Sequence, residues 1–282
     1  MKVDRDKFIE EGYIGPFKLN DKYKINSLLR ERYIPRQLYT WQKSSHEKSA
    51  PIVRIASDQS IIDKLKQLLG NDILLWGSLL IDQKPGAKHG MHLDVEHGSW
   101  DGVTAWIGLK NLNNKTPLSL ITYSHLLNTS PIELNKKNNI GNYNYQDILK
   151  EAQKLDSRCE LKTFYLNPGE FIIWSGKIWH STSNNSSNSR QSIILQYCSP
   201  NNVVKIPENF DYPNTKWSKT KPPCVSISGR DNFNYNTVLS KDSVEPSSEL
   251  LRELKTLILY NGRYKLATLY NKLKKYYKHL SK

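Results

Sequence analysis

Apolar residues recur with helical spacing in the first 70 residues of the chain. Residues 6–12 form a short amphipathic segment that stops at Gly12. In residues 60–70 five aliphatic side chains fall on one helical face, and Gly70 follows at a position that suits the C-terminal end of a helix. These patterns predict two helices before the main body of the fold.

Beyond residue 70 the pattern changes to short runs of β-branched and aromatic residues, which predict strands. Each run is bounded by Gly, Pro, Asn or Asp, and the runs lie at 73–81, 102–109, 118–123, 170–175 and 192–198. Residues 131–160 look like an insertion with a helix near 145–155. No regular helical crossover separates the strands, so an antiparallel sandwich or barrel is favoured over a parallel sheet.

The last part of the chain has a different composition. From about residue 200 it is rich in Pro, Asn and Ser, and helical spacing returns at Glu249 in two apolar stripes. Residues 249–282 carry nine Lys or Arg against two Glu, which is half of the net charge of +14. We expect a main domain over 1–240 and a basic helical extension over 241–282, whose stripes suit packing or homodimer formation. A nucleic-acid partner is disfavoured because the lysines follow no known binding motif.

Composition narrows the class of protein further. A mean hydropathy of −0.63 indicates a soluble globular protein. We expect no membrane span, since no segment approaches the roughly 20 apolar residues required. The N-terminus lacks a secretory signal, and Cys159, Cys198 and Cys224 form no Cys-x-x-Cys pair. These features predict a cytoplasmic protein with reduced thiols.

Candidate metal ligands lie beside the predicted strands. His92 and Asp94 are two residues apart, so on an extended backbone their side chains project from the same face. His180 follows the strand at 170–175 across a short turn. Two histidines and one carboxylate on a triangular face leave coordination positions open, as in non-haem Fe(II) oxygenases. The His-x-Asp pair alone would be weak evidence, because such pairs arise often by chance.

Arg190 adds a second requirement of that chemistry. It lies ten residues after His180 and opens an apolar strand. A dicarboxylate co-substrate that chelates iron at one end needs a bidentate cation for its distal carboxylate, and the guanidinium group has that geometry.

The order of these residues, together with several motifs between them, resembles the phytanoyl-CoA dioxygenase family. The resemblance runs from about Phe8 to Tyr197, and more loosely to about residue 240. The chain departs from the family at Thr122-Tyr-Ser-His125, where the family often has Pro-Gly-Ser-His. The motifs are His92-x-Asp94, Trp106-Ile-Gly-Leu, Leu118-x-Leu-Ile-x-x-Ser-His125, Pro168-Gly-Glu-x-x-x-Trp174, His180 and Arg190.

The resemblance implies a mainly β fold with flanking helices, built on a double-stranded β-helix (jelly-roll, cupin-like) core at about 73–198. It also implies Fe(II) held by His92, Asp94 and His180, with 2-oxoglutarate and O₂ as co-substrates and Arg190 at the distal carboxylate. Thr182 matches a position where family members often place a hydroxyl against that carboxylate. Because Asp94 supplies the carboxylate that halogenating relatives lack, hydroxylation is favoured over halogenation.

The substrate is the least determined part of the prediction. A small molecule is expected, and the basic balance suits an anionic or carrier-linked one. Glu96 is a candidate substrate contact, and Trp106 and Trp174 are expected to fill the barrel. Three further side chains could contact substrate, although a core or loop role is favoured for each: Trp100, Trp179 and Arg230.

Two other functions stay open at this point. One is a catalytically silent jelly-roll binding module that uses the basic extension for a partner. The other is a cupin-type metalloenzyme that does not use 2-oxoglutarate and would be indifferent to Arg190→Ala.

Overall fold

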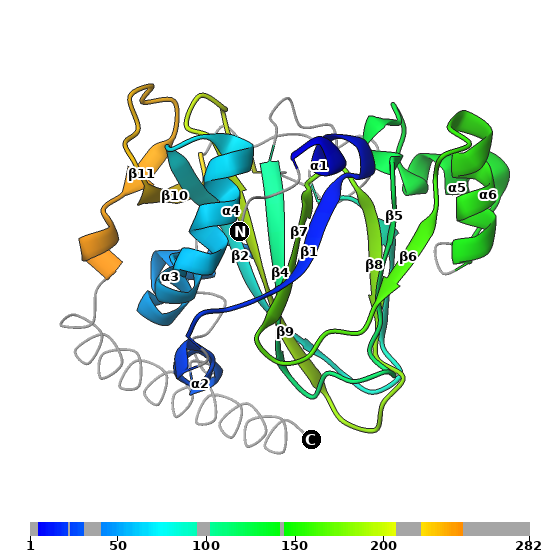
Figure 1. The fold of residues 1–282 in the computed structure, drawn as a ribbon, viewed down its shortest axis with the longest axis horizontal. Helices are drawn as coiled ribbons and strands as arrows, with labels where there is room; N and C mark the ends of the chain where they lie inside the picture. Colours follow the sequence, from blue (N-terminus) through cyan, green and yellow to red (C-terminus); the bar gives the residue numbers. More distant parts are fainter. Residues whose placement is uncertain are drawn as a thin grey trace, which may run out of the picture.

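Two β-sheets face each other at the centre of the molecule (Figure 1). The computed structural model describes residues 5–21, 23–30, 41–94, 102–141, 144–206 and 221–244. The large sheet has the strand order β1-β7-β4-β9-β2-β10-β11, and the small sheet has the order β3-β8-β5-β6. All pairings are antiparallel except β10 with β11. This is the predicted jelly-roll core with flanking helices.

The large sheet is built from the following strands: β1 (Tyr13–Lys18), β2 (Ile73–Gln83), β4 (Gly102–Lys110), β7 (Glu170–Ser175), β9 (Arg190–Cys198), β10 (Pro223–Ser228) and β11 (Thr237–Leu239). The small sheet contains β3 (Lys88–His92), β5 (Leu118–Ile121), β6 (Leu161–Phe164) and β8 (Trp179–Ser183). The helices are α1 (Arg5–Glu11), α2 (Tyr23–Arg30), α3 (Ala50–Ala56), α4 (Gln59–Leu69), α5 (Pro131–Asn138) and α6 (Tyr145–Leu155), with short 3₁₀ turns at Ser45–Glu47, Ser124–Leu126 and Lys241–Val244.

Helices cover the outer faces of both sheets, so apolar side chains fill three layers. α3 and α4 pack on the outer face of the large sheet, where Leu65 and Leu195 belong to the same buried cluster. A second cluster, which includes Trp106 and Trp174, fills the space between the sheets. A third cluster joins α5 and α6 to the small sheet through Ile148. Each strand therefore sends alternate residues to the interior and to a helical layer.

The predicted helices and strands are confirmed where the sequence pattern was strong. The five predicted strands are β2, β4, β5, β7 and β9, and the predicted helices at 6–12, 60–70 and 145–155 are α1, α4 and α6. Gly70 ends α4 at a positive φ of 89°, which a residue without Cβ adopts at little cost. The helical extension predicted from Glu249 lies outside the described residues, as does its suggested role in dimer formation.

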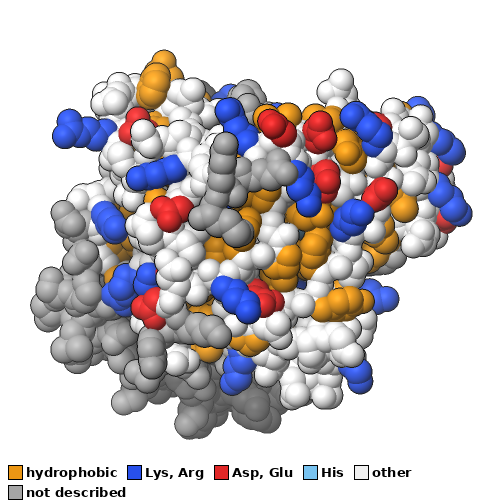
Figure 2. Space-filling model, viewed as in Figure 1, with side chains coloured by type: hydrophobic (Ala, Val, Ile, Leu, Met, Phe, Trp, Pro, Cys, Tyr) orange, Lys and Arg blue, Asp and Glu red, His pale blue; other side chains and the backbone are white. Residues whose placement is uncertain are grey.

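Charged side chains of both signs are interspersed on the face of the molecule shown in Figure 2. Lys and Arg alternate there with Asp and Glu over the described surface, without a continuous basic stripe. Within the described ranges, no helix combines the length and the apolar character that crossing a membrane would require.

Candidate metal centre

His92 and His180 are directly opposite each other in the small sheet. They are paired residues of the antiparallel strands β3 and β8. Opposite residues of such a pair project from the same face, and their imidazole centroids are 4.2 Å apart. A strand pairing thus brings together two residues that are far apart in the sequence.

Hydrogen bonds to the backbone fix the orientation of both imidazole rings. Nδ1 of His92 donates to the carbonyl oxygen of Gly90 at 2.9 Å, and Nδ1 of His180 donates to that of Ile178 at 3.0 Å. Each ring therefore keeps Nε2 free as a ligand atom. Burial lowers the pKa of His92 to about 3 and also lowers that of His180. Both rings are neutral at neutral pH, as metal ligation requires.

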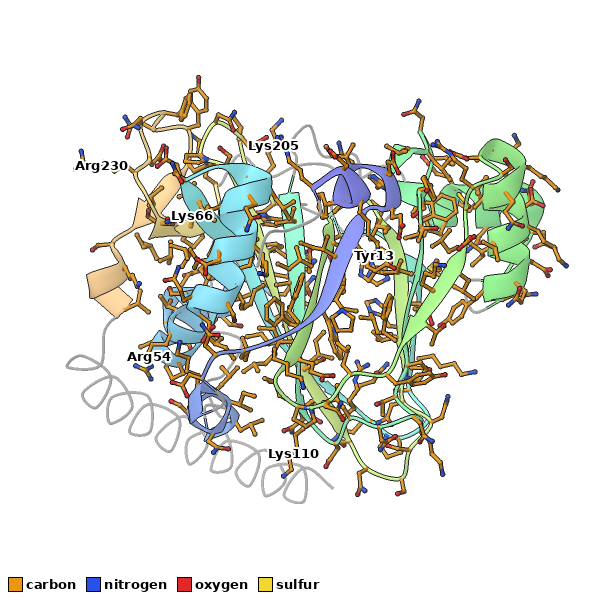
Figure 3. The ribbon with its side chains drawn as sticks, in the orientation of Figure 1. Tyr13, Arg54, Lys66, Lys110, Lys205 and Arg230 are labelled. Atoms are coloured by element: carbon orange, nitrogen blue, oxygen red, sulfur yellow. The ribbon has the colours of Figure 1, made fainter. Side chains whose placement is uncertain are left out.

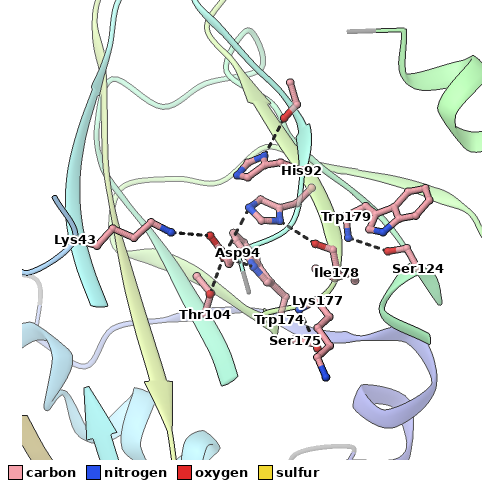
Figure 4. Close-up of polar contacts among 12 residues, drawn as sticks. Lys43, His92, Asp94, Thr104, Ser124, Trp174, Ser175, Lys177, Ile178 and Trp179 are labelled. Atoms are coloured by element: carbon pink, nitrogen blue, oxygen red, sulfur yellow. Dashed lines mark hydrogen bonds and ion pairs between the residues drawn. The ribbon is translucent and has the colours of Figure 1, made fainter. Parts of the chain in front are cut away.

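Asp94 follows β3 and is held by polar contacts on every side (Figure 4). Its backbone N–H donates to the carbonyl oxygen of Gly176 in the turn before β8, at 2.9 Å. Thr104 and Trp174 donate to Oδ2 at 2.8 and 3.2 Å, and the ammonium group of Lys43 lies 3.5 Å from Oδ1. Burial alone would raise the pKa of this carboxyl, but the charge of Lys43 leads the opposing contributions, and the pKa falls well below its usual range.

These three side chains fit one metal ion. The ligand atoms offered by His92, Asp94 and His180 all lie within 4.8 Å of one another. Two neutral imidazoles and one carboxylate form the donor set of a facial triad. It is the only such group of three potential ligands within the described residues.

Arg190 opens strand β9 and lacks the partners that a buried cation normally has. Its side chain is 0% exposed, and none of its guanidinium nitrogens has a hydrogen-bond partner among the described residues. The guanidinium carbon lies 5.1 Å from the ring centroid of Trp106. Burial lowers its pKa to about 10, so it stays charged at neutral pH. A buried unpaired cation is strongly unfavourable, which indicates that an anion belongs there.

The predicted hydroxyl at Thr182 lies on the Arg190 side of the interior. Thr182 is two residues after His180 in β8, so its side chain shares the interior face with that ligand. Its backbone oxygen accepts a hydrogen bond from Gln83, and Gln83 is paired with Arg190 across β2 and β9. This position is compatible with the predicted contact.

The remaining candidates are not brought to the triad. Trp179 is fully buried in the cluster beneath α5 and α6, on the face of β8 opposite to His180, which agrees with the core role favoured for it and does not support a place at the substrate mouth. Arg230 lies at the outer edge of the large sheet (Figure 3), and its backbone N–H donates to Asp72, so its predicted substrate contact is not supported. Glu96 and Trp100 lie outside the described residues.

Sequence reasoning missed three polar contacts of the metal centre. Thr104 and Trp174 lie on the interior faces of β4 and β7, at positions that a strand pattern assigns to the core. The alternation in β4 could have indicated Thr104, since a polar residue shares a face with Trp106 there. Lys43 lies 51 residues before Asp94 in an irregular segment, and no sequence signal links the two.

Comparisons with known proteins agree with this geometry. The family model described as phytanoyl-CoA dioxygenase (PhyH) matches residues 28–192, a range that contains the triad and Arg190. None of the curated proteins matches the chain significantly.

Several solved structures share the fold. A non-haem monooxygenase, ThoJ in its apo form, has a TM-score of 0.59 at 13% identity and covers 94% of this chain and 98% of its own. CytC3 with Fe(II) and α-ketoglutarate has a TM-score of 0.57 at 17% identity, covering 84% and 91%. The epimerase SnoN, in complex with Fe³⁺, α-ketoglutarate and nogalamycin RO, has a TM-score of 0.55 at 16% identity, covering 83% and 96%.

Proposed function

This chain belongs to the phytanoyl-CoA dioxygenase family of Fe(II)- and 2-oxoglutarate-dependent oxygenases, and we propose that it hydroxylates an unactivated C–H bond of a small molecule. In this proposal His92, Asp94 and His180 are the iron ligands, and Arg190 and Thr182 bind the distal carboxylate of 2-oxoglutarate. The neighbours CytC3 and SnoN, whose structures contain iron and α-ketoglutarate, support the same assignment of co-substrate.

The protein's part in the reaction is to bind iron and 2-oxoglutarate and to orient them. When bound, iron and 2-oxoglutarate supply the oxidising chemistry, with O₂ consumed and 2-oxoglutarate converted to succinate and CO₂. The backbone contacts of the two histidines aim Nε2 of each ring at a common point. The donors around Asp94 hold its carboxylate ionised and in one orientation. The side chains of Asp94, His180 and Arg190 are buried, which limits the access of bulk water to them.

The observation that carries this proposal is the state of Arg190. A fully buried guanidinium with three unpartnered nitrogens is costly unless an anion completes it. A dicarboxylate that chelates the metal at one end would place its other carboxylate there and form a bidentate pair. A cupin-type metalloenzyme without 2-oxoglutarate would have no use for that cation.

Asp94 supports hydroxylation in particular. Halogenation requires an open position for a halide at the site of the carboxylate ligand. Here a carboxylate fills that position, and Thr104, Trp174 and Lys43 all contact it.

The direct test is turnover of the co-substrate. Purified protein with Fe(II), 2-oxoglutarate and O₂ is expected to release succinate, since such enzymes slowly turn over 2-oxoglutarate without their substrate. His92→Ala is expected to abolish this release, and circular dichroism checks that the variant is folded. Succinate release that does not depend on added Fe(II), or that survives in His92→Ala, would contradict the proposal, and so would its complete absence in the wild-type protein. Isotope from ¹⁸O₂ in an alcohol product would identify hydroxylation once a substrate is found.

A further inference from the structure

A row of paired residues crosses the interior face of the large sheet beside Asp94. Gln196 on β9 is the Cα partner of Gly77 on β2 and of Thr104 on β4. Directly paired residues project from the same face, and Thr104 donates to Asp94, so this face is the one that lines the metal centre. Gln196 therefore belongs to the wall of the candidate site.

The side chain of Gln196 is a buried polar group without a partner. It is 0% exposed, and neither its amide nitrogen nor its amide oxygen has a hydrogen-bond partner among the described residues. A Cβ atom built on Gly77 would lie 2.5 Å from Oε1 of Gln196. The amide thus extends over Gly77, where only a glycine leaves room for it. An unsatisfied buried amide is unfavourable, and its donor and acceptor are both free to bind a ligand.

Lys43 reaches the same space from the neighbouring segment. Its carbonyl oxygen accepts a hydrogen bond from the backbone N–H of Ser78, the residue after Gly77. Its side chain extends across the interior to Asp94, as Figure 4 shows, and is 18% exposed. The cation of Lys43 therefore contacts Asp94 directly, and Gln196 is the strand partner of Thr104, whose hydroxyl donates to the same carboxylate.

The charged side chains of the site, counted over the described residues, leave one positive charge in excess when Fe(II) and 2-oxoglutarate are bound. Asp94, Lys43 and Arg190 are among the charged side chains that act electrostatically on His89, whose ring centroid lies 4.0 Å from that of His92. The two positive charges of Fe(II) and the two negative charges of 2-oxoglutarate cancel. Lys43 and Arg190 together then exceed Asp94 by one positive charge among the described residues. Excess charge in a largely buried site is unfavourable, and one negative charge on the substrate would remove it.

We propose that Lys43 and Gln196 form the substrate subsite, and that it takes a small carboxylic acid with an N–H or O–H donor beside its carboxylate. Lys43 and the Gln196 amide nitrogen would bind the carboxylate, and Oε1 of Gln196 would accept from the neighbouring donor. This inference rests on the proposed function, because the charge balance assumes bound Fe(II) and 2-oxoglutarate.

The test compares acids with amides of the same shape. N-acetyl amino acids and 2-hydroxy acids are added to the wild-type protein, under argon with Fe(II) and saturating 2-oxoglutarate, alongside the corresponding primary amides. The readout is the melting temperature, so no turnover is needed. At least one acid is expected to stabilise the protein and to bind about tenfold or more tightly than its amide, since a buried charge partner is gained.

Three variants and one control assign that preference to the subsite. Lys43→Met is expected to abolish the preference for acids, while Lys43→Arg keeps it. Gln196→Glu, which differs little in shape but adds a negative charge, is expected to shift the preference towards the amides. Lys66→Met, which removes an exposed positive charge from α4, is expected to leave the preference for acids intact.

The inference is wrong if no acid binds more tightly than its amide, or if Lys43→Met retains the preference. Binding of 2-oxoglutarate to the wild-type protein with Fe(II) is measured in the same instrument before any acid is added. If 2-oxoglutarate fails to bind, the proposed function itself is contradicted. If it binds and the acids behave like the amides, only the assignment of the subsite fails.

Discussion

The two faces of strand β9 differ sharply in how well their polar groups are hydrogen-bonded. Ile193, Leu195 and Tyr197 point into the apolar layer beneath the helices, where even the Tyr197 hydroxyl donates to the carbonyl oxygen of Ala56. On the opposite face, Arg190 and Gln196 are equally buried yet have no hydrogen-bond partner within the described residues. On one face of β9 the buried hydroxyl of Tyr197 is hydrogen-bonded, whereas on the other face two buried polar side chains lack partners.

The unpartnered polar side chains on the interior face of β9 lie where we propose that ligands bind. Native interiors satisfy nearly all of their buried polar groups, and the exceptions concentrate at functional sites. The helix-covered face contributes stability through packing. On the interior face, the unpartnered polar groups lower the stability of the ligand-free protein, and in our proposal a dicarboxylate and a substrate provide the missing partners.

The largest expected effect separates the two faces by activity. Asp94→Ala is expected to abolish metal-dependent turnover of 2-oxoglutarate, because it removes one of three ligands and leaves Lys43 without its counter-charge. Leu195→Ala is expected to retain turnover at low temperature, since it changes only the outer layer. Succinate release by both purified variants checks this. Activity in Asp94→Ala close to that of the wild-type protein would show that the proposed triad is not required for turnover.

Stability separates the faces in the opposite direction. Leu195→Ala creates a cavity in a fully buried layer and is expected to lower the free energy of unfolding by about 2–5 kcal/mol. Arg190→Met, without ligands, is expected to leave it unchanged or to raise it, because an unpaired buried cation is replaced by an apolar group of similar length. Urea unfolding measures both variants. A strong destabilisation in Arg190→Met would mean that its guanidinium has a structural partner.

His46 provides a contrast to Arg190 and Gln196, because it is a buried polar group whose two ring nitrogens both have hydrogen-bond partners. Nε2 donates to the carbonyl oxygen of Pro223 at 2.8 Å, and Nδ1 contacts Oγ of Ser78 at 2.9 Å. Burial lowers its pKa to about 4 from 6.5. The unfolded chain therefore binds the proton more tightly than the folded protein does. The stabilisation that neutral His46 provides is complete above pH 6.5 and is lost as the pH falls towards 4.

The expected contribution of His46 is roughly 3 kcal/mol over that window. His46→Gln cannot titrate, so its unfolding free energy should depend less on pH than that of the wild-type protein between pH 7 and 4.5. The difference between the two proteins isolates His46 from the other buried histidines. Equal pH dependence would show that His46 is accessible to solvent.

The smallest expected effect concerns the contacts around the carboxylate. Thr104→Val keeps the shape of the side chain and removes the hydroxyl that donates to Oδ2 of Asp94. Metal affinity is expected to fall by about 10–100-fold, with little change in fold. Titration with Co(II), followed by its visible absorption, measures the affinity. An unchanged affinity would mean that Trp174 and Lys43 suffice to orient the ligand.

Much of this fold could be predicted because its central strands are buried on both faces and rich in apolar residues. β4 and β9 are buried between a helical layer and the interior, so they appear as continuous apolar runs. β3 and β8 were not predicted, because their sequences, KHGMH and WHSTS, are short and carry the site's polar residues. The polar residues of the site thus interrupt the apolar pattern from which these two strands could have been predicted.

The metal ligands and Arg190 could be predicted because a small number of spacings suits that chemistry. Their supporting contacts could not. Lys43 depends on an irregular segment that pairs with Ser78, and Gln196 looks like any other residue of an apolar strand. Trp179 lies in the core although it is next to His180 in the sequence, because adjacent residues of a strand face opposite sides.

The central claim is that the triad and Arg190 together bind iron and 2-oxoglutarate. Calorimetric titration of 2-oxoglutarate under argon tests it most directly, with the wild-type protein and Arg190→Met, each with and without Fe(II). The account predicts one equivalent bound by the wild-type protein with Fe(II), with affinity lost without the metal and reduced by at least about thirtyfold in Arg190→Met. Binding of equal strength in Arg190→Met, or binding that does not require Fe(II), would contradict it.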